Sequence, residues 1–224
     1  AYVIFDMPLA ACVTAVWTGV ALECARGRSD ARRLAMYGAI AAGVLLKGPV
    51  MLAWALGGSA GAALLARSRA PLRWLAWAPG WLLVVAIAGG WFALALRRHP
   101  EYARYAFLEE SLERMTSGSF AREQPWWFVP VVLAAGTLPW SLATPWWRRR
   151  RSPGSAGGSA SGEEGLLSVE SRTGLGFVLF AAVFFTLSHS KLVTYLLPAL
   201  PMLAWTAAEA WSDAERARRG AWGL

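Results

Sequence analysis

The sequence predicts an all-α fold, a polytopic transmembrane helical bundle of about seven membrane segments. The first observation behind this prediction is composition, because hydrophobic residues make up 56% of the 224 positions and charged residues only 16%. The second is pattern, because the apolar residues come in long blocks and not in the short stripes of a soluble core. A membrane helix needs roughly 20 mostly apolar residues, which these blocks supply.

Five apolar blocks follow one another along the chain. They cover residues 7–25, 34–66, 74–96, 126–147 and 173–211. The second and the last are too long for one crossing. Lys47-Gly48-Pro49 interrupts the second block and Ser188-His189-Ser190-Lys191 interrupts the last. Each of these two blocks is therefore predicted to form two crossings joined by a polar corner.

Orientation is predicted from the positions of the charges. The net charge is +8, and most of the 22 basic residues lie in 26–33, 67–73, 148–172 and the C-terminal tail. With seven crossings these four regions fall on one side, which the positive-inside rule makes cytoplasmic. A membrane protein with this distribution needs no nucleic acid to explain its charge, and none is expected as a partner. Asp6, the two polar corners and the segment 97–125 then lie on the opposite side.

Three regions are predicted. Residues 1–147 hold membrane helices and the non-cytoplasmic loop 97–125, whose charges nearly balance. Residues 148–172 are rich in Arg, Gly and Ser, which is typical of a flexible cytoplasmic linker. Residues 173–224 hold the C-terminal membrane helices and a basic tail. The chain opens on Ala1 without an initiator Met, so we expect it to be an internal or C-terminal fragment of a longer protein.

Asp6 has two interpretations. It lies two residues before Pro8 at the start of a predicted helix, where a carboxylate can cap free backbone N–H groups. Alternatively, it lines a polar cavity as a general base or a ligand for sugar hydroxyls, because ionisable groups at membrane depth are costly and usually face such cavities.

Lys47 and Lys191 pose a similar choice. They are the only lysines in the chain, and both lie at the predicted corners on the non-cytoplasmic side. Each is either an interfacial lysine that extends its ammonium to water or a cation that awaits an anionic headgroup. His99 and His189 have no third ligand at metal spacing, so the sequence supports no metal site, although a divalent metal stays possible.

Four stretches, in this order, resemble the bacterial aminoarabinose (lipid A) transferase and protein O-mannosyltransferase-like family, the polyprenyl-phosphate-sugar glycosyltransferases of the GT-C class. These stretches are Phe5-Asp6-Met7-Pro8-Leu9, Leu46-Lys47-Gly48-Pro49, Phe107-Leu108-Glu109-Glu110 with Arg114 and Gln124-Pro125-Trp126-Trp127-Phe128, and 185–198 with Ser188-His189-Ser190-Lys191 and Tyr195.

The resemblance implies an enzyme of the bacterial inner membrane that moves a sugar from a polyprenyl phosphate to a lipid or protein acceptor on the periplasmic face, inverting the anomeric centre. It implies that Asp6 is a catalytic carboxylate and that Glu110 can line the cavity. It also implies that Lys47, Arg114, Lys191 and Tyr195 bind the donor phosphate. The family's acidic first periplasmic loop has no counterpart in this sequence, so we expect the fragment to be incomplete for catalysis.

A membrane transporter or lipid flippase is the alternative, because broken helices and buried charges also mark substrate pathways. A transporter would place polar residues near the bilayer centre and would show duplicated halves. Here the predicted polar residues gather at one edge, which favours the transferase.

Overall fold

The computed structural model describes residues 5–99, 124–138, 168–188 and 191–221, and every regular element within these ranges is a helix. The α-helices are α1 Asp6–Arg26, α2 Asp30–Lys47, α3 Val50–Ala66, α4 Ala78–Val84, α5 Gly90–Arg98, α8 Phe128–Gly136, α10 Val169–Leu187 and α11 Leu200–Ala221. Two 3₁₀ helices, η1 Ala70–Ala76 and η4 Val193–Ala199, and one π-helical turn, η2 Val85–Gly89, complete the set.

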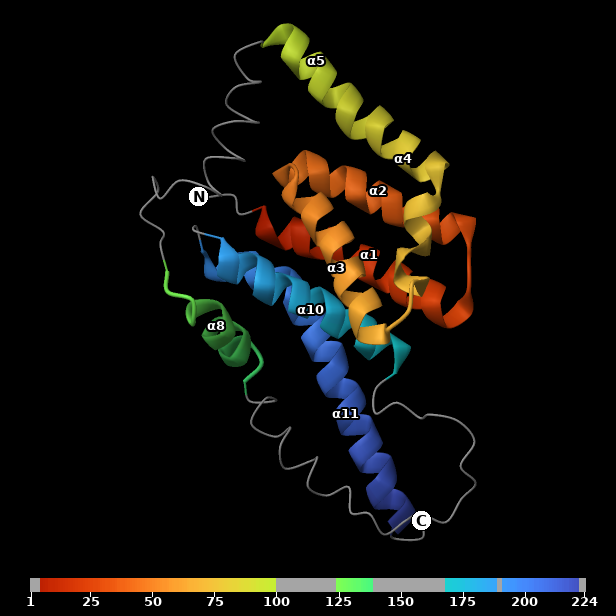
Figure 1. Ribbon diagram of the computed structural model, residues 1–224, viewed down its shortest axis with the longest axis vertical. Coiled ribbons are helices and arrows are strands. Elements are labelled where there is room, and N and C mark those ends of the chain that lie inside the picture. The colour runs from red at the N-terminus through yellow and green to blue at the C-terminus, as the bar shows by residue number, and fades with distance from the viewer. Residues whose placement is uncertain (1–4, 100–123, 139–167, 189–190, 222–224) are drawn as a thin grey trace.

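Helices α1, α2, α3 and α10 pack into one bundle, as Figure 1 shows. Helices α1 and α2 form a hairpin, and α3 lies along α10. Helices α4 and α5 continue one another through η2 and extend along the outer side of α2. Helix α8 lies beside α10, and α11 leads away from η4.

Both predicted helix breaks are present. Helix α2 ends at Lys47, Gly48 follows with φ 68°, and Pro49 precedes the first residue of α3. Glycine suits this position because a positive φ costs it little, and proline cannot continue the preceding helix. The second break separates α10, which ends at Leu187, from η4, which begins at Val193.

The predicted number of seven membrane segments is not confirmed. Three of the described helices are long and apolar enough to cross a membrane, namely Asp6–Arg26, Ala78–Arg98 and Val169–Leu187, and Val50–Ala66 is a shorter apolar helix. Helix α2 includes charged residues at both ends, from Asp30 to Lys47, which lowers its mean hydropathy. The 126–147 block yields α8, and residues 139–147 of that block lie outside the described residues.

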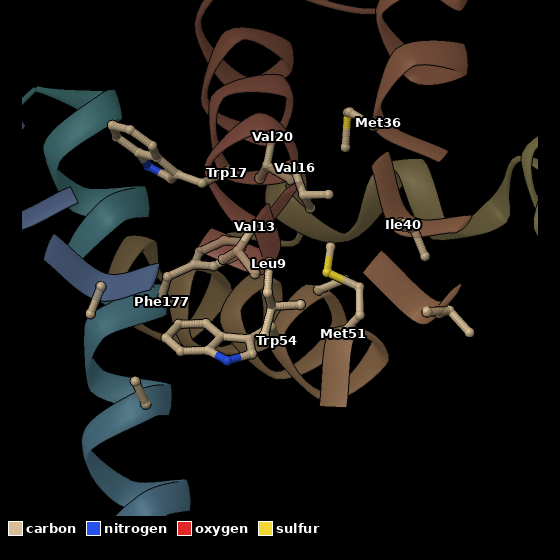
Figure 2. Packing of buried hydrophobic residues seen from close by; sticks show 14 of the residues in the cluster. Leu9, Val13, Val16, Trp17, Val20, Met36, Ile40, Met51, Trp54 and Phe177 are labelled. Carbon is tan, nitrogen blue, oxygen red and sulfur yellow. The ribbon is translucent and has the colours of Figure 1, made fainter. Parts of the chain in front are cut away.

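The core lies where α1, α3 and α10 meet (Figure 2). Leu9 and Val13 of α1 point toward Trp54 of α3 and Phe177 of α10. All four side chains are almost fully buried. The interlocking of these large side chains fixes the positions of the helix ends, and therefore of the polar residues at those ends.

Helices α3 and α10 approach most closely at glycines. A Cβ added to Gly61 would overlap the backbone carbonyl of Gly176, and one added to Gly58 would overlap the ring of Phe177. Small residues at such contacts let helix backbones approach in membranes, where packing drives association.

Candidate functional site

The candidate site lies at the end of the bundle where α1 begins, α2 ends and η4 begins, on the left in Figure 1. Asp6 is the first residue of α1 and Lys47 the last residue of α2. Tyr195 comes from η4, which packs against α1. Three segments far apart in sequence therefore bring their polar side chains to one place.

Lys47 is the centre of this cluster. Its ammonium forms an ion pair with the Asp6 carboxylate and lies 4.6 Å from the centroid of the Tyr195 ring. The Asp6 side chain is only 9% exposed and that of Lys47 26% exposed. A buried carboxylate needs such a partner, because leaving it uncompensated in a poorly hydrated site costs several kcal/mol.

The capping interpretation of Asp6 is wrong. Phe5 occupies the N-cap position, and no side chain accepts a hydrogen bond there. Asp6 is already helical, and its carboxylate bonds to Lys47 instead. The interfacial interpretation of Lys47 also does not describe its position, because the ammonium points to a buried carboxylate and an aromatic face.

A row of aromatic rings leads from the core to the Tyr195 ring. Phe185 of α10 lies 5.6 Å from it between ring centroids, and Trp54 of α3 lies 6.0 Å from Phe185. Trp54 is almost fully buried in the core. The face offered to Lys47 is therefore fixed by the packing of three elements.

Lys191 lies in the same region but has a different contact. It is 8% exposed, and its ammonium donates a hydrogen bond of 3.0 Å to the backbone carbonyl of Gln124. This bond ties the residues just before α8 to the residues just before η4. The structure thus gives Lys191 a contact with the chain itself, whereas its proposed contact with a phosphate stays a prediction.

Three of the predicted positions cannot be placed. Arg114 and Glu110 lie outside the described residues, as does His189. His99 follows the last residue of α5. Within the described part of the chain, no group of three or more His, Cys, Asp or Glu residues could hold a metal ion.

A surface groove of about 650 Å³ runs along α1 and α2 and reaches Pro201 of α11. Its walls are mainly small and apolar, and Arg32 lies among its lining residues. Met7 is the lining residue nearest in sequence to the cluster, and Asp6, Lys47 and Tyr195 do not line the groove.

Sequence reasoning missed two polar clusters away from this end. Arg33 and Glu23 form a two-pronged ion pair with side chains 7% and 6% exposed, and its Nε–Oε2 distance is 3.0 Å. Glu209 of α11 accepts hydrogen bonds from Ser168 and Ser171 at the start of α10. The expectation that ionisable residues outside the basic loops gather at one side is therefore wrong for Glu23 and Glu209.

The signal for the Glu23–Arg33 pair was present in the sequence. The two residues lie ten positions apart, on either side of the short turn at Gly27. An antiparallel hairpin brings such positions together. The pairing was not predicted, because Arg33 was grouped with the other arginines of the basic loop 26–33.

Comparison with known proteins gives a consistent result, although no family model matches the chain. An undecaprenyl phosphate-α-4-amino-4-deoxy-L-arabinose arabinosyl transferase of Pseudomonas fluorescens is 30% identical over 165 residues, or 66% of this chain. A transferase of the same name from Sodalis glossinidius is 34% identical over 130 residues, or 55% of this chain. The chain spans 27% and 20% of these two relatives, about a quarter of their length.

Solved structures agree on the fold. The structure of ArnT from Cupriavidus metallidurans bound to undecaprenyl phosphate matches 94% of this chain with a TM-score of 0.75 at 24% identity. The same protein in the apo state matches with a TM-score of 0.71. In both cases the chain covers 38% of the ArnT chain. In sequence, the chain is thus similar to part of proteins named as undecaprenyl phosphate-aminoarabinose arabinosyl transferases, and it shares the helical fold of ArnT, which is the resemblance that its motifs predicted.

Proposed function

We propose that this chain is part of an integral-membrane glycosyltransferase that moves a sugar from a polyprenyl-phosphate donor to a lipid or protein acceptor. The observation that carries the proposal is the Asp6–Lys47–Tyr195 cluster, in which a lysine ammonium lies between a carboxylate and an aromatic ring. The relatives' names support the donor class, since each includes an undecaprenyl phosphate-linked aminoarabinose. These names also favour a transferase over a transporter or flippase.

In the proposed chemistry, one set of residues acts on the leaving phosphate and another residue acts on the acceptor. As the glycosidic bond breaks, charge develops on the leaving phosphate, and fixed cations in a poorly hydrated site stabilise it strongly. We assign this role to Lys47, with Arg114, Lys191 and Tyr195 as further phosphate ligands. Asp6 orients or deprotonates the acceptor, so that a single displacement inverts the anomeric centre.

The proposed location is the bacterial inner membrane, with several crossings and the active face in the periplasm. It rests on the distribution of arginines. Helix α1 ends at Arg26 and α3 ends just before Arg67, and Figure 1 shows both of these helix ends away from the end of α2, where Lys47 lies. The positive-inside rule makes that opposite end cytoplasmic.

The test is the release of undecaprenyl phosphate from undecaprenyl phosphate-linked aminoarabinose by the reconstituted full-length protein that includes this chain, with lipid A as the acceptor. We expect Lys47→Met to lower turnover by roughly 10²-fold or more, because a preorganised charge on the leaving group is lost. Arg69→Met is the matched control, since it removes an exposed cation from the opposite end of the bundle. Turnover by Lys47→Met equal to that of the control would contradict the proposal.

A further inference from the structure

Two residues with separate roles in the proposed reaction are bound to each other. Lys47, the proposed phosphate cation, forms its ion pair with Asp6, the proposed acceptor carboxylate. In this state neither charge is available for its role. The Asp6 carboxylate is buried and neutralised, and the Lys47 ammonium already has an anionic partner.

An arriving phosphate requires the same ammonium. A phosphate oxygen and a carboxylate oxygen are both anionic, and like charges brought together at a poorly hydrated site disfavour one another. The Tyr195 ring is neutral and meets the ammonium with its face, so it can stay in contact while the anion changes. Of the two partners that Lys47 has among the described residues, Asp6 is the one that competes with phosphate.

The surroundings of Lys47 keep it in place during such a change. Lys47 lies in the last turn of α2, where the negative end of the helix dipole favours a cation. Gly48 ends the helix directly after it, and its N–H bonds back to the carbonyl of Val44 at 2.8 Å. The Tyr195 ring in turn contacts the ring of Phe185.

We propose that Lys47 exchanges Asp6 for the donor phosphate while remaining on the Tyr195 ring, so that donor binding releases the Asp6 carboxylate toward the acceptor. Before the donor binds, the carboxylate is held in the ion pair and cannot act as a base. The exchange therefore requires that the donor binds before the acceptor reacts. This inference rests on the proposed function and adds regulation to the same site.

The inference is tested by the binding of undecaprenyl phosphate to the full-length protein that includes this chain, in lipid nanodiscs, with undecaprenol as the phosphate-free probe. We expect Asp6→Asn to bind undecaprenyl phosphate roughly tenfold more tightly, because the competing anion is gone. The same variant should turn over roughly 10²-fold more slowly. Asp30→Asn is the matched control: it also removes a carboxylate from the first residue of a helix, but from an exposed pair with Arg28, and it should change neither quantity.

Two substitutions of Tyr195 distinguish a role of its ring from a role of its hydroxyl. Tyr195→Phe removes only the hydroxyl, whereas Tyr195→Leu also removes the ring on which Lys47 lies, so we expect Tyr195→Leu to weaken the affinity for undecaprenyl phosphate roughly tenfold more than Tyr195→Phe does. Asp6→Ser serves as a second variant in case Asp6→Asn does not fold, with the same expected gain in affinity.

The outcomes distinguish the exchange from the proposed function. Equal affinity of the wild type for undecaprenyl phosphate and undecaprenol would overturn the proposed phosphate site itself. A clear preference for the phosphate, with no gain in affinity in Asp6→Asn or Asp6→Ser, would overturn the exchange alone. Equal loss of affinity in Tyr195→Phe and Tyr195→Leu would overturn the role of the ring.

Discussion

At the scale of single residues, the Glu23–Arg33 pair is the more deeply buried of the two ion pairs that join α1 and α2 among the described residues. Both side chains are almost fully buried, and two nitrogens of Arg33 meet the two oxygens of Glu23. Removing one partner would leave the other charge buried without compensation, which is far more costly than removing both.

We therefore expect Glu23→Gln to lower the free energy of unfolding by about 3 kcal/mol. The double variant Glu23→Leu/Arg33→Met should stay close to the wild type, because it leaves no buried charge. The stability of both variants is measured by thermal unfolding in detergent, with tryptophan fluorescence as the signal. Asp30→Asn, in the exposed pair with Arg28, should change the stability by less than about 0.5 kcal/mol. A double variant as unstable as Glu23→Gln would contradict this account.

The sequence predicted some residues of the candidate site but not the contacts that they make. Lys47 and Lys191 stood out because they are the only lysines and interrupt apolar blocks. Nothing in the sequence paired Lys47 with Asp6, because the partners lie 41 positions apart and meet only once α1 and α2 pack antiparallel. Nor could the sequence assign Lys191 to the carbonyl of Gln124, since any residue type offers a backbone carbonyl.

At the scale of elements, the contact between α3 and α10 decides the shape of the bundle. Gly61 meets Gly176 backbone to backbone, so the helices lie closer than side chains would allow. This contact also sets the distance between Trp54 and Phe185, which support the Tyr195 ring.

We expect Gly61→Ala to destabilise the protein by about 1–3 kcal/mol, because its methyl group would overlap the carbonyl of Gly176 and force the helices apart. Gly38→Ala is the matched control on α2, since a Cβ there meets nothing within 4 Å. There the same substitution should be neutral or stabilise by up to about 1 kcal/mol, because alanine favours the helix. Unfolding temperatures compare the two variants directly, and a Gly61→Ala protein as stable as Gly38→Ala would exclude a tight backbone contact.

Apolar blocks and their polar interruptions predicted most helices, since the block at 7–25 became Asp6–Arg26 and both breaks are present. The continuity of Ala78–Arg98 through a π-helical turn was not predictable, because no proline or polar residue marks that turn. The number of crossings was harder to predict still. It depends on how charged helix ends such as those of α2 sit in the bilayer, which hydropathy alone does not determine.

At the scale of the whole molecule, the arrangement of the helix ends predicts a topology. Ser68 follows α3 at the arginine-rich end, and Gln124 is bonded to Lys191 near the candidate site. Both residues are exposed. In a background with Cys12→Ala and Cys24→Ala, we expect Ser68→Cys to react with an impermeant maleimide only from the cytoplasmic side and Gln124→Cys only from the periplasmic side. Labelling of both from the same side would disprove the topology.

The division of the chain into three regions stays a prediction. If it holds, the packing of α10 is what joins the two membrane parts of the chain at the candidate site. Asp6 and Lys47 precede the predicted linker 148–172, whereas Lys191 and Tyr195 follow it. What brings the two groups together is the seating of α10 against α1 and α3, with Gly176 against Gly61. The two parts are therefore held together by helix packing, and a covalent connection between them is less important. The predicted linker 148–172 extends too far, because Val169 already belongs to α10 and Ser168 and Ser171 bond to Glu209. We therefore expect two genes that encode the parts separately to complement one another, provided that the second part keeps Ser168 and Ser171.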